Sequence, residues 1–372
     1  MVNIGVIGLG SVWEARYRPA LGRLGQRLHV RAVYDPVAGR AELTAAEHHT
    51  IAEGGLLALA RRPDVDAVLL LDTGWYGCEA LRLLCSAAKP IYIAADLGDE
   101  PSTLLALHWT AVSFGLTLMP ELGCRYTPAS NRLKELIATR LGQPKHIRLC
   151  VDGGGIGLNS PETGEPDSEA LQAVRRCLVG WFDWLWYVFR TPPVSVSVER
   201  EQGDWSIFRE DALPSPTTSG RKMDLSPSLP SHAQGSSHPV IRIEYAPPRN
   251  SEDRPVAEIC IRDDAGAPDA PHVGRPEVVC ERGVAVIHTP TIIRWKVDGD
   301  ADFTMESLLA DRSETEVMLD HFCRRVVGGL IPVADLADIS RSLELIKASR
   351  ESARSGEPVA LNGQPGRMKD EG

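Results

Sequence analysis

The chain opens with MVNIGVIGLGSVWEARYRPAL, residues 1–21, and this stretch decides the fold. Residues 4–7 are apolar and suited to a strand, Gly8 and Gly10 follow at once, and residues 12–24 favour a helix. A strand, a glycine turn and a helix N-terminus leave backbone N–H groups free to bind an anion such as a pyrophosphate. We therefore expect a nucleotide-binding βα unit at this end of the chain.

An acidic residue, Asp35, follows the next predicted strand at 30–34. This is about the spacing at which a dinucleotide-binding βαβ unit bonds a ribose 2′-hydroxyl. A carboxylate there favours NAD(H) over NADP(H), because a 2′-phosphate would meet a negative charge. The alternative is an exposed turn residue before Pro36. The third motif position, where Gly or Ala lets helix and strand approach, is Trp13.

Composition and charge exclude several classes of protein. With 372 residues, 43% hydrophobic and 24% charged, the chain has the make-up of a globular protein and the length of two domains. A net charge of −10 argues against a nucleic-acid partner. No run of about twenty apolar residues is present, so no membrane partner is expected. The N-terminus has no cationic segment leading into an apolar one, which predicts a cytoplasmic location.

Cysteines and histidines give no sign of a metal site. The eight cysteines form no CxxC pair, and the ten histidines show no ligand spacing such as HExxH. Most of the cysteines lie in apolar segments, so we expect reduced, packed thiols. A bound metal ion is therefore not expected.

Strand and helix patterns alternate through the first third of the chain, which predicts a doubly wound parallel sheet with ligands at the carboxyl ends of its strands. Farther on, strands predominate and indicate a mostly antiparallel sheet. The predicted fold class is α/β. A Rossmann domain is expected at 1–121, and an α+β substrate or oligomerisation domain at 122–361. A mobile Pro/Ser-rich loop is expected at 213–238 and a polar tail at 362–372.

The individual elements follow from periodicity and turn signals. Helices are expected at 12–24, 38–47, 79–88, 101–113, 129–139, 168–189, 314–327 and 336–355. Strands are expected at 4–7, 30–34, 65–71, 91–94, 116–119, 146–151, 194–199, 240–245, 257–262, 277–280 and 284–288. The glycines at 153–157 are not followed by Lys-Ser/Thr, so they indicate a flexible loop at a pocket rim rather than an ATPase phosphate loop.

Five further segments occur in a familiar order. They are DVDAVLLL, AKPIYIAADLG, RYTPASNRLKELIATRLGQPKHIRL, WFDWLWYVFRTPPVSVSV and EVMLDHFCRRVVGGLIPVADLADISRSLELIKASRESARSGEPVAL. With the glycine turn, they make the chain similar to the Gfo/Idh/MocA family, the glucose–fructose oxidoreductase and inositol dehydrogenase type, to about Leu361. The resemblance implies a Rossmann domain, a nicotinamide cofactor and oxidoreductase chemistry.

The resemblance also implies a catalytic lysine in a Glu-Lys-Pro triplet, where this chain has Ala94, Ala95 and Asp96. A cation there would orient a substrate hydroxyl and favour the alkoxide-like charge that develops as hydride leaves. Ala95 cannot do this, and no lysine lies between Lys89 and Lys134.

The second catalytic group that the resemblance implies is an aspartate and a histidine, four residues apart on the long helix. Their positions here are Arg176 and Gly180, so the proton-accepting imidazole is absent as well. Arg176, Gly180 and Asp183 are expected on one helical face toward the pocket. Arg176 could hold a carboxylate or phosphate there, or be a surface residue. Asp183 and Arg125 are each interpreted as structural, with pocket roles as the alternative.

A third departure lies at the end of the strand 65–71. Where the family commonly has a small residue followed by Thr-Pro-Asn, this chain has LDTGW. A carboxylate on Asp72 would oppose a pyrophosphate unless it points away. The bulky Trp75 could stack on a ring of the cofactor or fill an empty pocket. The predicted nucleotide contacts are Gly8, Gly10, Ser11, Val12, Trp13, Asp35, Leu71, Asp72 and Trp75.

Three interpretations of function remain open at this point. The first is a nucleotide-binding protein that has lost ordinary hydride transfer, a pseudoenzyme with a ligand-binding role. The second is an active NAD-dependent oxidoreductase on a sugar-like or small acidic substrate, with Asp96, Arg125 or Arg176 in new roles. The third is a structural subunit without a cofactor. We favour the first interpretation. A small-molecule ligand, sugar-like or anionic, and homo-oligomerisation through the second domain's sheet are also expected.

Overall fold

The computed structural model describes residues 1–98, 100–152, 169–201, 238–248, 253–262 and 272–361. The predicted glycine-rich segment at 153–157, the Pro/Ser-rich loop up to residue 237 and the tail at 362–372 lie outside the described residues. The chain forms two compact units. The first comprises Met1–Pro128, Leu178–Trp184 and Leu309–Ile346, and the second comprises Ala129–Cys177, Leu185–Leu308 and Lys347–Gly372. The predicted domain boundary at residue 121 stays a prediction.

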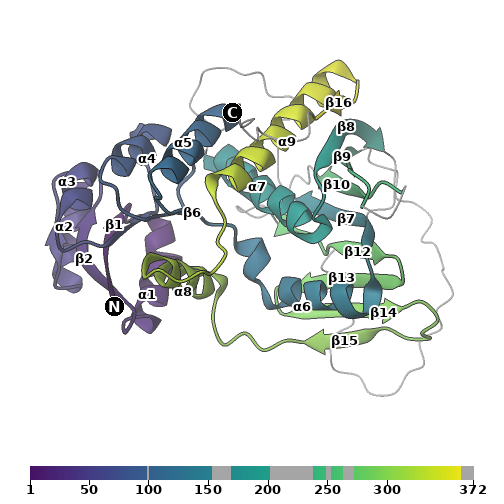
Figure 1. Ribbon diagram of the computed structural model, residues 1–372, viewed down its shortest axis with the longest axis horizontal. Coiled ribbons are helices and arrows are strands. Elements are labelled where there is room, and N and C mark those ends of the chain that lie inside the picture. The colour runs from purple at the N-terminus through teal and green to yellow at the C-terminus, as the bar shows by residue number, and fades with distance from the viewer. Residues whose placement is uncertain (99, 153–168, 202–237, 249–252, 263–271, 362–372) are drawn as a thin grey trace, which may run out of the picture. The chain divides into compact units, whose positions relative to one another are not determined.

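Six parallel strands form the sheet of the first unit, in the order β3-β2-β1-β4-β5-β6. Figure 1 labels β1, β2 and β6 of this sheet. This confirms the predicted doubly wound sheet. The strand order reverses between β1 and β4, and ligands of such sheets bind at the carboxyl ends of the strands on either side of that point. The strands are β1 (Val2–Ile7), β2 (Leu28–Tyr34), β3 (Ile51–Ala52), β4 (Ala67–Leu70), β5 (Ile91–Ile93) and β6 (Leu118–Pro120).

Helices cover both faces of this sheet. On one face, side chains of α1, α2 and α8 join Val6 and Leu69 in a single apolar core. On the other face, Leu59 of α3 lies so close to Gly5 that a Cβ there would be 2.3 Å from its side chain. The helices are α1 (Arg18–Arg23), α2 (Ala38–Glu47), α3 (Leu56–Arg61), α4 (Cys78–Cys85), α5 (Pro101–Ser113) and α8 (Glu314–Val326).

The first helix departs from the prediction. Instead of one α-helix at 12–24, a π-helical stretch at Trp13–Tyr17 precedes α1. Pro19 lies in the first turn of α1 and has no N–H to donate to the preceding turn, which disfavours continuous α-helical bonding there. Trp13 and Tyr17 are both buried in the core.

Helix α8 belongs to the first unit although it lies near the end of the chain. A capping box starts it: Ser313 Oγ accepts from the Glu316 N–H, and the Glu316 carboxylate accepts from the Ser313 N–H. Its apolar face packs Phe322 against Tyr92, with ring centroids 5.7 Å apart. Arg23 of α1 also pairs with Glu316 at 2.6 Å, so α8 is held to α1 by charge as well as by packing.

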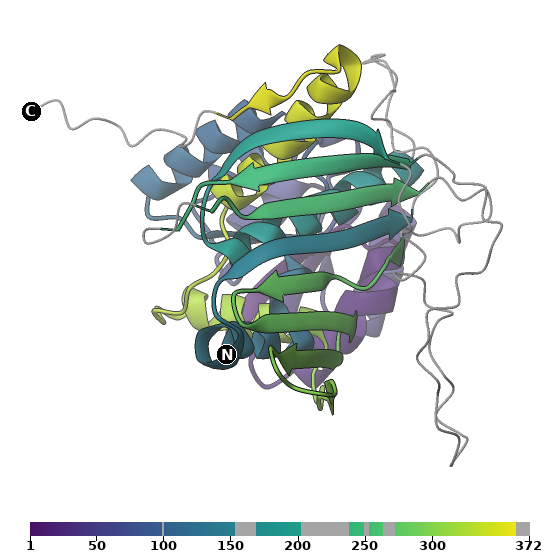
Figure 2. The same cartoon turned by 90° about the vertical axis from the view of Figure 1, so that its right-hand side faces the viewer.

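The second unit contains a larger sheet, seen face-on in Figure 2, in the order β15-β14-β13-β12-β7-β10-β9-β8-β16, with β11 beside β7. The pairing of β7 with β10 is parallel and the other pairings are antiparallel, as expected for a mostly antiparallel sheet. Subunit pairing through this sheet stays a prediction. The strands are β7 (Pro144–Asp152), β8 (Pro193–Glu201), β9 (His238–Tyr245), β10 (Val256–Arg262), β11 (His272–Val273), β12 (Glu277–Cys280), β13 (Gly283–Thr289), β14 (Ile292–Val297), β15 (Thr304–Ser307) and β16 (Val359–Ala360).

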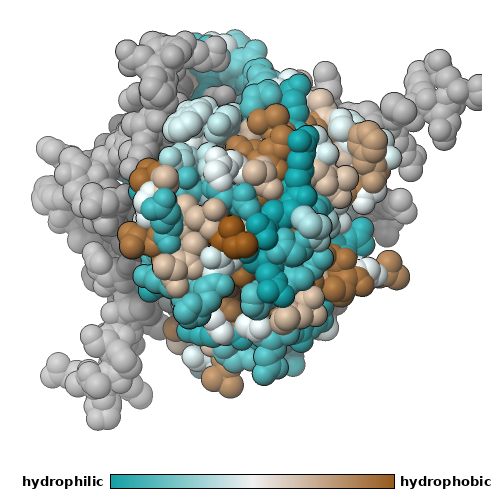
Figure 3. All heavy atoms as spheres, turned by 90° about the vertical axis from the view of Figure 1, so that its left-hand side faces the viewer, coloured by the Kyte–Doolittle hydropathy of each residue, from teal (hydrophilic) through white to brown (hydrophobic). Residues whose placement is uncertain are grey.

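Three further helices complete the fold: α6 (Pro128–Leu136), α7 (Glu169–Phe189) and α9 (Leu336–Ser355). In the second unit, Phe189 at the end of α7 packs on Tyr245 of β9, with ring centroids 4.4 Å apart. Within the described ranges, no helix is both long enough and apolar enough to cross a membrane. On the face drawn in Figure 3, apolar residues form small groups separated by hydrophilic ones.

Candidate functional site

The glycine turn after β1 is tight at its first glycine and open at its second. Gly8 has a φ of +89°, and a Cβ there would be 2.5 Å from the Cβ of Asp72 and 2.6 Å from its backbone nitrogen. Only glycine meets both demands. A Cβ on Gly10 would meet no atom within 4 Å. The first helical turn that follows, at Ser11 and Val12, has N–H groups without intrahelical partners, as at any helix start.

Asp35 is buried and bonded within the protein. Its side chain is 2% exposed. One carboxylate oxygen accepts from the N–H of Leu9, in the glycine turn, at 2.8 Å, and the other accepts from the N–H of Val37 at 2.8 Å. Asp35 therefore fixes the glycine turn to the end of β2. It is neither the exposed turn residue that the sequence allowed nor a carboxylate open to a ribose.

Sequence reasoning missed Arg40, in the first turn of α2. Its Nη1 lies 3.3 Å from both oxygens of Asp35, and its side chain is 48% exposed. The signal was available in the sequence, because an arginine near this acid is the usual partner of a 2′-phosphate. The local charge at the end of β2 is thus balanced rather than negative.

Trp13 is part of the core. It is 1% exposed, and its ring packs edge-on against His48 at the end of α2, with centroids 5.6 Å apart. Its indole Nε1 has no hydrogen-bond partner among the described residues. A side chain with so little exposed surface cannot contact a ligand. The large Trp13 ring at the third motif position therefore packs inside the protein, against the end of α2.

The segment after β4 closes the other side of the turn. Leu71 N–H donates to the carbonyl of Ile7 at 2.8 Å, and the Asp72 carboxylate accepts from the N–H of Gly74 at 2.9 Å. Trp75 is 76% exposed and lies beside Tyr76, with ring centroids 5.5 Å apart. Such exposure excludes the alternative in which Trp75 fills an empty pocket. The ring of Trp75 is accessible for stacking.

Ala95 lies just beyond the end of β5. The N–H groups of Ala94 and Ala95 both donate to the Leu70 carbonyl, at 2.9 and 3.2 Å. Asp96 bends back on its own loop, where its carboxylate accepts from the N–H of Gly98 at 2.9 Å.

Glu121, at the end of β6, was not singled out by sequence. Its N–H donates to the carbonyl of Ile93 in β5 at 2.8 Å, and its carboxylate pairs with Arg16 of the first helical segment. Arg16 also donates to the hydroxyl of Thr315 at 3.1 Å. The pair links the first helical segment, β6 and the start of α8.

Arg125 and Asp183 form a buried ion pair. The Nε of Arg125 donates to Oδ2 of Asp183 at 2.5 Å, and its Nη2 contacts the second oxygen and also lies 3.3 Å from Asp338. Burial raises the pKa of Asp183 to about 6, and Arg125 opposes that rise. The geometry agrees with the structural interpretation of both residues.

The three residues predicted to share one face of α7 differ in their exposure to solvent. Arg176 is exposed, whereas Asp183 is 2% exposed and Gly180 is half-buried. A Cβ on Gly180 would lie 3.5 Å from Sγ of Cys124, an ordinary contact distance. Of the predicted pocket residues, the structure thus joins Arg125 with Asp183 in the first unit, while Arg176 belongs to the second.

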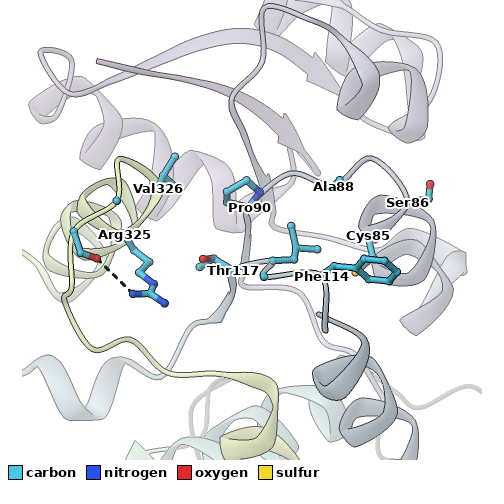
Figure 4. A pocket seen from close by; sticks show the side chains of 12 residues that line it. Cys85, Ser86, Ala88, Pro90, Phe114, Thr117, Arg325 and Val326 are labelled. Atoms are coloured by element: carbon cyan, nitrogen blue, oxygen red, sulfur yellow. Dashed lines mark hydrogen bonds between the residues drawn. The ribbon is translucent and has the colours of Figure 1, made fainter. Parts of the chain in front are cut away.

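A cavity of about 500 Å³ opens elsewhere on the first unit, where β5 and β6 begin. Figure 4 shows Arg325 and Phe114 on opposite sides of it, with Pro90 and Thr117 between them. Its lining includes none of the predicted site residues. Among the residues that the structure describes, no group of His, Cys, Asp and Glu is arranged to hold a metal ion.

The chain resembles solved structures over nearly its whole length. An NAD-binding oxidoreductase from Klebsiella pneumoniae superposes with a TM-score of 0.70 at 16% identity, covering 98% of this chain and 99% of that one. An oxidoreductase from Thermotoga maritima gives 0.70 at 15% identity, covering 96% and 98%. A UDP-N-acetylglucosamine 3-dehydrogenase from Acidithiobacillus ferrooxidans gives 0.66 at 16% identity, covering 95% and 97%.

This chain shares the fold of these solved oxidoreductases. The neighbours confirm the architecture that the motifs implied. By sequence, no family model and no curated protein matches the chain. At such low identity the likeness concerns the fold, and the chemistry has to be argued from the residues of the site itself.

Proposed function

We propose that this protein binds a nicotinamide dinucleotide at the carboxyl edge of its six-stranded sheet, and that it has lost ordinary hydride transfer to alcohols in favour of a ligand-binding role. The observation that carries the proposal is the glycine turn. It lies where the strand order reverses, and the space beside Gly10 is open. Neighbours named as an NAD-binding oxidoreductase and a dehydrogenase support the cofactor class.

The residues present fit such a cofactor. Gly10, Ser11 and Val12 would hold the pyrophosphate through backbone N–H groups at a positive helix end. The exposed ring of Trp75 offers a surface for stacking. When bound, the nicotinamide supplies the site with a hydride donor or acceptor. The protein's own part is to hold and orient it.

The loss of hydride transfer rests on what surrounds the strand ends. Ala95 and Gly180 offer no group that could take a proton from an alcohol. Two arginines of the first unit have carboxylate partners, Arg16 with Glu121 and Arg125 with Asp183. These pairs lower the free charge available to a substrate, which favours binding without turnover over an active site with rearranged catalytic groups.

The binding part is tested by denaturing purified protein and measuring absorbance at the adenine and nicotinamide bands, followed by titration with NAD(H) and NADP(H) monitored by thermal shift. We expect saturable binding. Ala95→Lys should bind nucleotide equally well and still fail to oxidise polyols or hydroxy acids, because position 180 lacks a base. Alcohol oxidation by that single variant would contradict the proposed loss of the proton path, and absence of nucleotide binding would favour a structural subunit.

A further inference from the structure

The acid after β2 usually decides between NAD and NADP, and by that rule Asp35 predicts NAD. The rule assumes a carboxylate that is free to accept from the ribose 2′-hydroxyl. In this protein both oxygens of Asp35 already accept from backbone N–H groups, those of Leu9 and Val37, each at 2.8 Å. The side chain is 2% exposed. A ribose hydroxyl could donate to Asp35 only by displacing hydrogen bonds that hold the glycine turn in place.

Breaking those bonds is unfavourable. A buried backbone N–H that loses its partner has no water to replace it, so the lost hydrogen bond is not compensated. The Leu9 N–H belongs to the turn that would hold the pyrophosphate, so releasing Asp35 would also loosen the anion site. Asp35 is therefore best described as a residue that positions the turn.

Arg40 covers the outer side of this carboxylate. Its Nη1 is shared between the two oxygens at 3.3 Å each, which is long for an ion pair, and its side chain is 48% exposed. Arginine carries five N–H donors in a planar fork, and within the part of the chain that the structure describes Arg40 bonds to Asp35 through one nitrogen, Nη1. The outer part of the guanidinium remains available to a second anion.

The position of Arg40 on α2 strengthens this site for an anion. It lies in the first turn of a ten-residue helix that begins at Ala38, where the helix dipole favours negative charge. A dinucleotide bound at this edge would bring its ribose close to Asp35. Because both oxygens of that carboxylate are already bonded, the group offered to the 2′ substituent would be the exposed guanidinium of Arg40.

We infer that the site accepts the 2′-phosphate of NADP(H), through a guanidinium of Arg40 that bridges Asp35 and the phosphate, and that it binds NADP(H) more tightly than NAD(H). This inference rests on the proposed nucleotide binding and reverses the preference that the sequence predicts. The phosphate replaces no bond of Asp35, so the glycine turn keeps its support when the cofactor binds.

The test uses the intact protein and two pairs of probes, NADPH with NADH and 2′,5′-ADP with ADP, each titrated by calorimetry. The wild type should bind the 2′-phosphorylated member of each pair about tenfold more tightly, a difference typical of one charge-assisted contact. Arg40→Gln should abolish the difference, and Arg40→Lys should keep part of it. Thermal melting of each variant shows whether the fold is intact.

Arg82→Gln is the matched control, because it removes an exposed arginine of the first unit that pairs with Glu79 on its own helix. It should leave both ratios unchanged. Equal affinity within each pair, tighter binding of NADH, or an unchanged ratio in Arg40→Gln would overturn the inference and leave nucleotide binding intact. Binding of none of the four probes would overturn the proposed function together with it.

Discussion

The two halves of the sheet's carboxyl edge have diverged to different degrees. At β1 and β2, Gly8 has the positive φ and the close backbone approach of a nucleotide turn, and Asp35 holds that turn in place. At β5 and on α7, Ala95 and Gly180 replace the groups that the family resemblance implies for proton transfer. Under the proposed function, the residues that would bind the nucleotide are kept and the groups that would transfer a proton are absent. The proposal thus assigns binding and proton transfer to separate residues, so that one could be lost without the other.

The largest expected effect concerns the buried pair beside α7. Arg125→Leu should lower the free energy of unfolding by about 3–5 kcal/mol, because it leaves the Asp183 carboxylate buried without its partner. Denaturant unfolding at neutral pH measures this. The pKa of Asp183 is already raised to about 6, so the folded state takes up its proton more readily than the unfolded chain. The loss should therefore shrink as the pH falls below that range.

Arg82→Leu removes an exposed ion pair and should cost less than about 0.5 kcal/mol. If Arg125→Leu were no more destabilising than this control, the ion pair of Arg125 and Asp183 would not stabilise the fold. The structural interpretation of both residues would then be wrong.

The glycine turn gives the second prediction. Gly8→Ala should cost about 2–3 kcal/mol and abolish nucleotide binding, because its Cβ would meet Asp72 and the residue has a positive φ. Gly10→Ala has open space, so it should fold normally and still bind nucleotide weakly, as the methyl group occupies the predicted pyrophosphate position. Thermal melts and nucleotide titrations of both variants decide this. Normal affinity in Gly10→Ala would place the nucleotide elsewhere.

Trp75 allows a test of binding without a change in the fold. Trp75→Ala removes an exposed ring, so the free energy of unfolding should change by less than about 0.5 kcal/mol. Nucleotide affinity should fall by about threefold to tenfold as stacking is lost. Calorimetric titration measures the affinity. An unchanged dissociation constant would remove Trp75 from the binding half of the edge.

The smallest effect is expected at Gly180 on α7, in the half of the edge that lacks the groups for proton transfer. Gly180→Ala should raise the free energy of unfolding by about 0.5–1 kcal/mol, because alanine favours a helix interior and its Cβ would contact Cys124 Sγ at an ordinary 3.5 Å. Chemical denaturation of the variant measures this. A destabilised variant would show that the missing base reflects crowding around α7 rather than a position left without a side chain.

Much of the fold could be predicted from local pattern. The strand at β1, the helix at α5 and the long helix α7 follow from periodicity and from glycine and proline signals. The two-residue strands β3, β11 and β16 carry too little periodic signal to be predicted, and β14 and β15 were not predicted either. The return of α8 to the first unit depends on contacts such as Phe322 with Tyr92, which are distant in sequence.

The site was predictable where a motif fixes the backbone and less so where side chains choose partners. Gly8 directly follows β1 and Ala95 lies just beyond β5, because both strands form where the sequence pattern predicts them. The bond from Leu9 to Asp35, the cover provided by Arg40 and the burial of Trp13 depend on side-chain orientation. Sequence spacing does not specify that orientation. Asp35 was therefore predicted to contact a ribose, whereas in the structure it bonds to the glycine turn.

The most direct measurement of the central claim follows nicotinamide absorbance in a solution of the wild-type protein saturated with NADP or NAD and supplied in turn with polyols, sugars and hydroxy acids. Saturation is checked in the same sample by tryptophan fluorescence. The account predicts full occupancy and no formation of reduced nicotinamide above the rate without protein. Sustained formation of reduced nicotinamide with any of these substrates would contradict it.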